Sequence, residues 1–127
     1  MTVQLNHTIV SARDKQASAR FLADLLGLEV SPRYGPFVPV EIPNGVTLDY
    51  MDVPGDVHPQ HYAFLVSETE FDAIFARIRK AGLTYWADPF HTRPGEINTN
   101  DGGRGTYFED PDGHNLEILT RPYGSGA

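Results

Sequence analysis

Cysteine is absent from this sequence of 127 residues. Its absence excludes disulfide bonds, thiolate nucleophiles and cysteine-type zinc sites, so any metal must be held by histidine, carboxylate and water. Basic residues are also few: ten Lys and Arg stand against 17 Asp and Glu, and the formal net charge is −7. Nucleic acids and anionic membranes attract an excess of positive charge, so neither is expected as a partner.

Long apolar runs are missing as well. The apolar stretches are too short to span a bilayer, and the opening MTVQLNHTIV lacks the basic and then apolar order of a secretory signal. These features predict a cytoplasmic protein. At 40% hydrophobic content, a chain of this length can bury a working core within one domain.

The order of predicted elements repeats once along the chain. Alternating and helical hydrophobic periods predict a strand, a helix and three strands in the first half, at residues 3–10, 14–27, 28–32, 37–42 and 46–52. The second half gives the same order at residues 61–66, 71–82, 83–87, 105–109 and 114–120. This duplication predicts an α+β fold. One helix per half covers only one face of its sheet, so the other face must surround a cavity or pack against something else.

Strand alternation places three possible metal ligands on the uncovered faces. In the strand HYAFLV, the bulky side chains at 62, 64 and 66 share one face, so His61 belongs to the other. In the closing strand, Glu117 lies opposite the apolar residues on either side of it. Alternation is less decisive for the first strand, where the repeat matches His7 to His61. Each residue also has an ordinary interpretation, as a packed or solvent-facing side chain.

Two imidazoles and one carboxylate suit a divalent first-row metal, and they leave positions open for substrate or water. The hypothesis from the residues alone is therefore a metal site at His7, His61 and Glu117.

Three segments carry a resemblance to a known group. LNHTIV, HYAFLV and above all FEDPDGHNLEIL resemble the vicinal oxygen chelate superfamily, which includes glyoxalases, bleomycin-resistance proteins and extradiol dioxygenases. The resemblance covers nearly the whole chain. It implies two βαβββ modules whose eight strands form a cup-shaped, partly open sheet around a metal. It further implies one domain over residues 1–127, with modules at 1–54 and 60–121, and the ligands His7, His61 and Glu117.

The sequence departs from the glyoxalase I pattern at one ligand. Thr47 stands where those members have a fourth ligand, a glutamate, and Asp49 lies two residues on, on the same face. The remaining set resembles extradiol dioxygenases and fosfomycin-resistance transferases. In both groups a tyrosine at the spacing of Tyr107 faces the substrate, where it could donate a hydrogen bond or line the pocket. Tyr107 and Asp49 are therefore the predicted catalytic residues, with Glu109 as a further proton carrier.

The sequence departs from the pattern of the extradiol dioxygenases and from that of the fosfomycin-resistance transferases. Asn98 replaces a histidine of some extradiol enzymes, and residues 46–52 contain no acid–base histidine. A phosphonate substrate would need cationic side chains, and the evident candidates are Arg93 and Arg104. Both lie in the long polar loop at residues 88–104, which is expected to cover the site.

Two function classes follow from the resemblance. The first is an enzyme that uses a divalent metal ion (Fe, Mn, Ni or Zn) and no organic cofactor. It would act on a small organic substrate with adjacent oxygens, by glyoxalase-like lyase or isomerase chemistry or by extradiol-like oxygenation. The alternative is a metal-independent drug-binding protein of the bleomycin-resistance type, with stacking surface from Tyr34, Phe37, Tyr50, Tyr85, Trp86 and Phe90. Members of this size usually complete their sites as homodimers, so a homodimer is expected.

Overall fold

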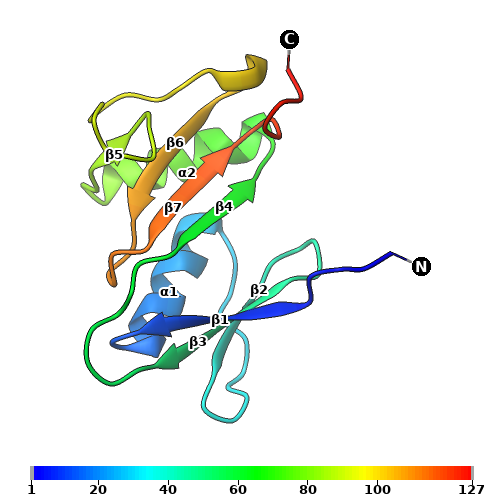
Figure 1. Ribbon diagram of the computed structural model, residues 1–127, viewed down its shortest axis with the longest axis vertical. Helices are drawn as coiled ribbons and strands as arrows, with labels where there is room; N and C mark the ends of the chain where they lie inside the picture. Colours follow the sequence, from blue (N-terminus) through cyan, green and yellow to red (C-terminus); the bar gives the residue numbers. More distant parts are fainter. Residues whose placement is uncertain (1, 127) are drawn as a thin grey trace. The chain divides into compact units, whose positions relative to one another are not determined.

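A computed structural model describes residues 2–126 of the chain. The chain divides into two compact units, Met1–His58 and Pro59–Ala127. Each unit contains one sheet and one α-helix (Figure 1). In the described part of the chain, no helix is long and apolar enough to cross a membrane.

The first unit is a three-stranded sheet with one helix. Its elements are β1 (His7–Ala12), α1 (Lys15–Leu26), β2 (Val38–Glu41) and β3 (Thr47–Asp52). The strand order is β1-β3-β2, with β1 parallel to β3 and β2 antiparallel to it. The Asp14 side chain caps α1 by accepting from the Ala17 amide, and Gly27 ends the helix in the left-handed conformation at φ 73°. The helix thus starts and stops where its local sequence dictates.

Only one face of this sheet is covered. The residues that pack beneath α1 are small or apolar, and their strand members are Val10, Ala12, Val38, Val40, Leu48 and Tyr50. The opposite face carries His7, Ile9, Thr47 and Asp49, and Ile9 remains 47% exposed. Because strand residues alternate between faces, burying the first set leaves the second set uncovered within this unit.

The second unit is a four-stranded sheet with the other α-helix. Its elements are β4 (His61–Leu65), α2 (Glu68–Lys80), β5 (Tyr85–Trp86), the 3₁₀ turn η1 (Asn100–Gly102), β6 (Gly105–Glu109) and β7 (Asn115–Leu119). The strand order is β4-β7-β6-β5, so β7 lies between β4 and β6 (Figure 1). β4 and β7 are parallel, and the remaining pairs are antiparallel.

The core of the second unit lies between the sheet and α2. From the helix it contains Phe71, Ile74 and Ile78, and from the strands Phe108, Leu116 and Ile118. The spacing of the helical residues is that of one helix face, as the sequence predicted. A capping box at Ser67 and Glu70 starts the helix, each side chain bonding the other's backbone amide.

The α+β prediction is confirmed, but the strand count is lower than predicted. The described residues form seven strands rather than eight. The strand expected at residues 28–32 is reduced to a single bridge between Val30 and Val40, and the one expected at 83–87 shortens to Tyr85–Trp86. Pro32 supplies no amide for pairing, which accounts for the early end of the first of these. The first strand starts at His7 rather than at residue 3.

Replacing Ser67 with alanine removes one half of the capping box and leaves an amide of the first turn of α2 without its partner. We expect the free energy of unfolding to fall by about 1 kcal/mol. Chemical denaturation measures this change. Thr69→Ala, an exposed change in the same turn, is the control and should have a much smaller effect. Equal stability of Ser67→Ala and the unmodified protein would contradict the capping role.

Candidate metal centre

The second unit has the carboxylate of Glu117 at the centre of its sheet. It lies in the middle of β7, where the register pairs it with Ala63 of β4 and Tyr107 of β6. Its side chain is only 1% exposed. A solvent-facing role is therefore wrong for this residue. A buried carboxylate is costly unless its oxygens are hydrogen-bonded, paired with a charge or bound to a metal.

His61 supplies the neighbouring nitrogen. Its Nδ1 lies 2.8 Å from the backbone oxygen of Asn115, which can only accept, so Nδ1 carries the hydrogen. The lone pair is then on Nε2, and Nε2 lies 3.1 Å from Oε1 of Glu117. Two electron-rich atoms thus face each other. A proton or a cation between them is needed to make this contact favourable.

The distance between these two atoms fits a shared metal ion. Bonds of about 2.0–2.2 Å that meet at about 90° put two ligand atoms about 3 Å apart. The separation of 3.1 Å between His61 Nε2 and Glu117 Oε1 matches that value. The carbonyl that fixes the His61 tautomer is the kind of outer partner that metal-bound histidines commonly have. These two residues of the predicted set therefore fit a metal.

The third predicted ligand, His7, belongs to the first unit. Its Nδ1 lies 2.6 Å from the side-chain oxygen of Asn6, an acceptor, so Nε2 again carries the lone pair. In the parallel pair of β1 and β3, His7 is level with Thr47, and Ile9 is level with Asp49. Asp49 therefore shares the uncovered face with His7, two residues along, as the sequence predicted. The participation of His7 in a metal site stays a prediction.

Tyr107 contributes a phenol beside the same pair. Its ring stacks on His61 at 5.8 Å between ring centroids, and the side chain is buried. Burial raises the pKa of the Tyr107 hydroxyl, with a further contribution from the Glu117 carboxylate. The group is therefore a neutral hydrogen-bond donor at neutral pH. Its catalytic role stays a prediction.

Tyr123 was missed by the sequence reasoning. Its hydroxyl lies 2.6 Å from each oxygen of Glu117 and 2.9 Å from the hydroxyl of Tyr107. Burial of the hydroxyl, and then its hydrogen bond to Glu117, raise its pKa well above the ordinary range. The residue follows β7 in a segment with no periodic pattern. No local signal distinguished Tyr123 from an ordinary surface aromatic.

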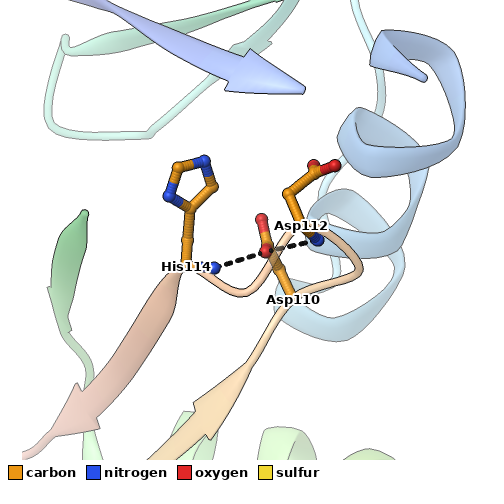
Figure 2. A group of neighbouring side chains, drawn as sticks. All are labelled: Asp110, Asp112 and His114. Carbon is orange, nitrogen blue, oxygen red and sulfur yellow. Dashed lines mark hydrogen bonds between the residues drawn. The ribbon is translucent and has the colours of Figure 1, made fainter. Parts of the chain in front are cut away.

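A second group of possible ligands lies in the turn between β6 and β7. Figure 2 shows Asp110, Asp112 and His114, whose nearest ligand atoms all lie within 4.8 Å of one another. Oδ1 of Asp110 accepts from the amides of Asp112 and His114, both at 2.9 Å. Nδ1 of His114 accepts from the Gln60 amide at 2.9 Å, so in the neutral ring Nε2 holds the hydrogen. His114 then has no lone pair to offer a metal. We conclude that this group is part of the hairpin turn.

The two arginines considered as anion ligands are both paired with carboxylates. Arg104 binds Glu68 and Asp72 of α2, each at 2.8 Å, and its guanidinium lies 4.4 Å from the centre of the Phe71 ring. Arg93 binds Glu96 at 2.8 Å. The pair of Arg104 holds its guanidinium on α2, whereas the pair of Arg93 is exposed and weak. Arg104 is directed to the helix side of the sheet.

The loop at residues 88–104 is folded onto its own unit. The Asp88 carboxylate accepts from the amides of Thr92 and Arg93, which closes a tight turn. His91 stacks on Trp86 at 3.7 Å between ring centroids and contacts the Asn115 side chain at 3.0 Å. These contacts engage both the ring and a ring nitrogen of His91 within its own unit.

Comparison with known proteins identifies the family of the chain. The sequence model of the Glyoxalase/Bleomycin resistance protein/Dioxygenase superfamily matches residues 4–118. The chain belongs to this superfamily. The resemblance stated from LNHTIV, HYAFLV and FEDPDGHNLEIL is thereby confirmed.

The chain is similar to a transferase and to two oxidases. It is 34% identical to "Glutathione transferase FosA" of Serratia marcescens over an alignment of 124 residues that covers 93% of this chain and 81% of the relative. Among solved structures, "Oxidase ChaP-H2" is 81% identical with a TM-score of 0.98, over the full length of both chains. "Oxidase ChaP-H1" is 67% identical with a TM-score of 0.95, covering 97% of this chain and 99% of the other. These relatives support enzyme activity within the superfamily.

Asp110 makes the stability depend on pH in a defined direction. Its Oδ2 is buried without a partner among the described residues, and burial raises the pKa of the carboxyl. The folded state then holds a proton that the unfolded state releases near pH 4, so stability is lost as pH rises through the folded pKa. We expect Asp110→Asn, which cannot ionise, to gain stability relative to the unmodified protein as pH rises above about 4.

Denaturation across a pH series measures this difference, with Asp24→Asn on the exposed face of α1 as the control. A difference between Asp110→Asn and the unmodified protein that is independent of pH would contradict the raised pKa.

Proposed function

We propose that this protein is an iron(II)-dependent enzyme that uses molecular oxygen to oxidise a small organic substrate with two adjacent oxygen atoms. One observation carries the proposal: the buried Glu117 carboxylate lies 3.1 Å from Nε2 of His61, whose Nδ1 faces the Asn115 carbonyl oxygen. A buried carboxylate and an imidazole lone pair in that arrangement suit a divalent cation.

The proposed ligands are His61 and Glu117 from the second unit and His7 from the first. Two histidines and one carboxylate with open positions are typical of non-haem iron(II) oxygenases. When bound, iron(II) supplies Lewis-acid and redox chemistry at this point. The chain's own residues hold the ion, orient the substrate and move protons.

Tyr107 and Asp49 are the proposed proton carriers. The Tyr107 hydroxyl stays protonated and lies 2.9 Å from the Tyr123 hydroxyl, and when substrate binds it can turn its hydrogen from the Tyr123 oxygen to a substrate oxygen. Asp49 lies on the uncovered face that also carries His7, where a carboxylate can accept a proton. We further propose that residues 1–127 act as one domain, in a homodimer.

Oxidation is favoured over the other reactions by the relatives and by the charged groups. A solved structure with 81% identity is called an oxidase. The relative named a glutathione transferase is more distant, at 34% identity, and Arg104, a candidate ligand for a phosphonate, is paired with carboxylates of α2. Glyoxalase-like lyase chemistry is retained as the second candidate enzyme function.

Drug sequestration is disfavoured by the positions of the aromatic residues. Tyr50 is 2% exposed, Tyr85 packs edge-on against Phe75, and Trp86 is stacked on His91. Tyr50 is therefore unavailable to a drug, and Tyr85 and Trp86 already use part of their ring surface within the protein. Of the six aromatic residues in the predicted surface, Tyr34 and Phe90 are the ones left highly exposed, at 75% and 85%.

Metal content tests the proposal directly. We expect protein reloaded with iron(II) in the absence of oxygen, and then desalted, to retain close to one iron per chain. Glu117→Gln keeps the shape of the side chain and removes its charge, so it should retain little or none. Glu29→Gln, a change of an exposed carboxylate in the first unit, should match the unmodified protein. Elemental analysis measures all three, and oxygen uptake with catechol-type probes then tests the chemistry.

Two outcomes would contradict parts of this proposal. Unmodified protein that retains neither iron nor manganese, nickel or zinc would overturn the metal site. Tight retention of zinc or nickel with no retention of iron would overturn the oxidase and favour the lyase function.

A further inference from the structure

The residue that controls the Glu117 carboxylate comes from the chain segment after β7. Tyr123 is the source of the hydroxyl that lies 2.6 Å from both Glu117 oxygens. Nothing in the superfamily pattern quoted above includes this position, which lies beyond the matched residues 4–118. The contact connects the last segment of the chain to the carboxylate that we propose as a metal ligand.

The segment is held in place by its own contacts. The Ser125 amide and hydroxyl both bond the Pro122 carbonyl, at 3.1 and 2.6 Å, which closes a turn around Tyr123. Arg121 reaches the Ser125 carbonyl at 3.2 Å, and the Gly126 amide bonds the Asp101 carboxylate at 3.3 Å. A side chain at Gly126 would collide with the Asp101 backbone. The close approach of these two residues therefore requires glycine.

The number of hydrogens on the two phenols decides which group donates in each contact of Tyr123. A phenol has one hydrogen, so Tyr123 can donate to only one Glu117 oxygen at a time. Oε1 faces Nε2 of His61, where a cation fits, so donation to Oε2 leaves Oε1 for the metal. The Tyr123 oxygen can then accept from the Tyr107 hydroxyl at 2.9 Å. The three groups form one chain of hydrogen bonds from Tyr107 to the carboxylate.

We propose that Tyr123 is a positioning residue for the metal centre, which holds Glu117 so that it offers a single oxygen to the metal beside His61. The inference rests on the proposed function, because it takes Glu117 to be a ligand. Tyr123 stays bonded to Glu117 when the metal binds and raises the affinity for the ion. Hydrogen-bond partners of metal ligands typically change metal affinity by about 10–100-fold when removed.

Tyr123→Phe tests the inference, because it removes the hydroxyl and keeps the ring. Cobalt(II) is the probe, since its visible absorption reports the number and geometry of its ligands. We expect the cobalt dissociation constant to rise by about 10–100-fold, and the spectrum of the saturated variant to differ from that of the unmodified protein. Tyr34→Phe removes the hydroxyl of an exposed tyrosine in the first unit and should change neither.

A second variant moves the segment without altering the phenol. Gly126→Ala places a methyl group against the Asp101 backbone, so this end of the segment must shift, and we expect the shift to weaken the contact of Tyr123 with Glu117. We expect weaker cobalt binding here too, in the same direction as Tyr123→Phe. Thermal unfolding of the metal-free proteins checks that each variant is folded. A metal-free melting temperature close to that of the unmodified protein would separate the positioning effect from a loss of stability.

The outcomes separate the two hypotheses. If the unmodified protein binds cobalt and Glu117→Gln does not, the metal site stands. Unchanged or tighter binding by Tyr123→Phe would then overturn the positioning role alone, and tighter binding would show that the phenol competes with the metal. If the unmodified protein and Glu117→Gln bind cobalt equally weakly, both the proposed function and the inference fail.

Discussion

The arrangement of the second unit depends on one carboxylate that is buried in the centre of a sheet. Glu117 has only 1% of its side chain exposed, and its oxygens meet His61 on one side and Tyr123 on the other. An isolated charge in that position would cost several kcal/mol, so the surrounding groups must bond or neutralise it. The Asn115 carbonyl accepts a hydrogen bond from His61 Nδ1, and this bond fixes the tautomer of the ring that faces Glu117. A cation bound by both His61 and Glu117 would complete the set.

The side of each sheet that faces away from its helix follows from the use of one helix per unit. In both units the apolar residues of alternate positions pack on the helix, and the intervening positions face the other way. Those positions carry His7 and Asp49 in the first unit, and His61, Tyr107 and Glu117 in the second. The alternation that places apolar residues in the cores therefore places the candidate site residues on the opposite faces. In each sheet, one side packs on the helix and the other carries the candidate site.

The sequence predicted the helices and most of the strands well, because their signals are local. Ser67 and Glu70 form the capping box at the start of α2, and apolar residues at helical spacing define its buried face. The errors fell where local signals are weak. The stretch around Val30 has strand-like composition but forms a single bridge, and β5 keeps only Tyr85 and Trp86. Short strands depend on the neighbours that they find, and those neighbours are distant in the sequence.

The sequence by itself determined which residues share a face and that His61 and Glu117 belong to the same one, because alternation along a strand is a local property. It also indicated the superfamily, through the spacing of its motifs. Only the tertiary structure decided that Tyr123 bonds Glu117, that the Asn115 carbonyl fixes the His61 tautomer, and that Arg104 is bound by Glu68 and Asp72. Each of these contacts joins residues that are apart in the sequence. The local pattern of one segment therefore does not indicate which residue of another segment it will contact.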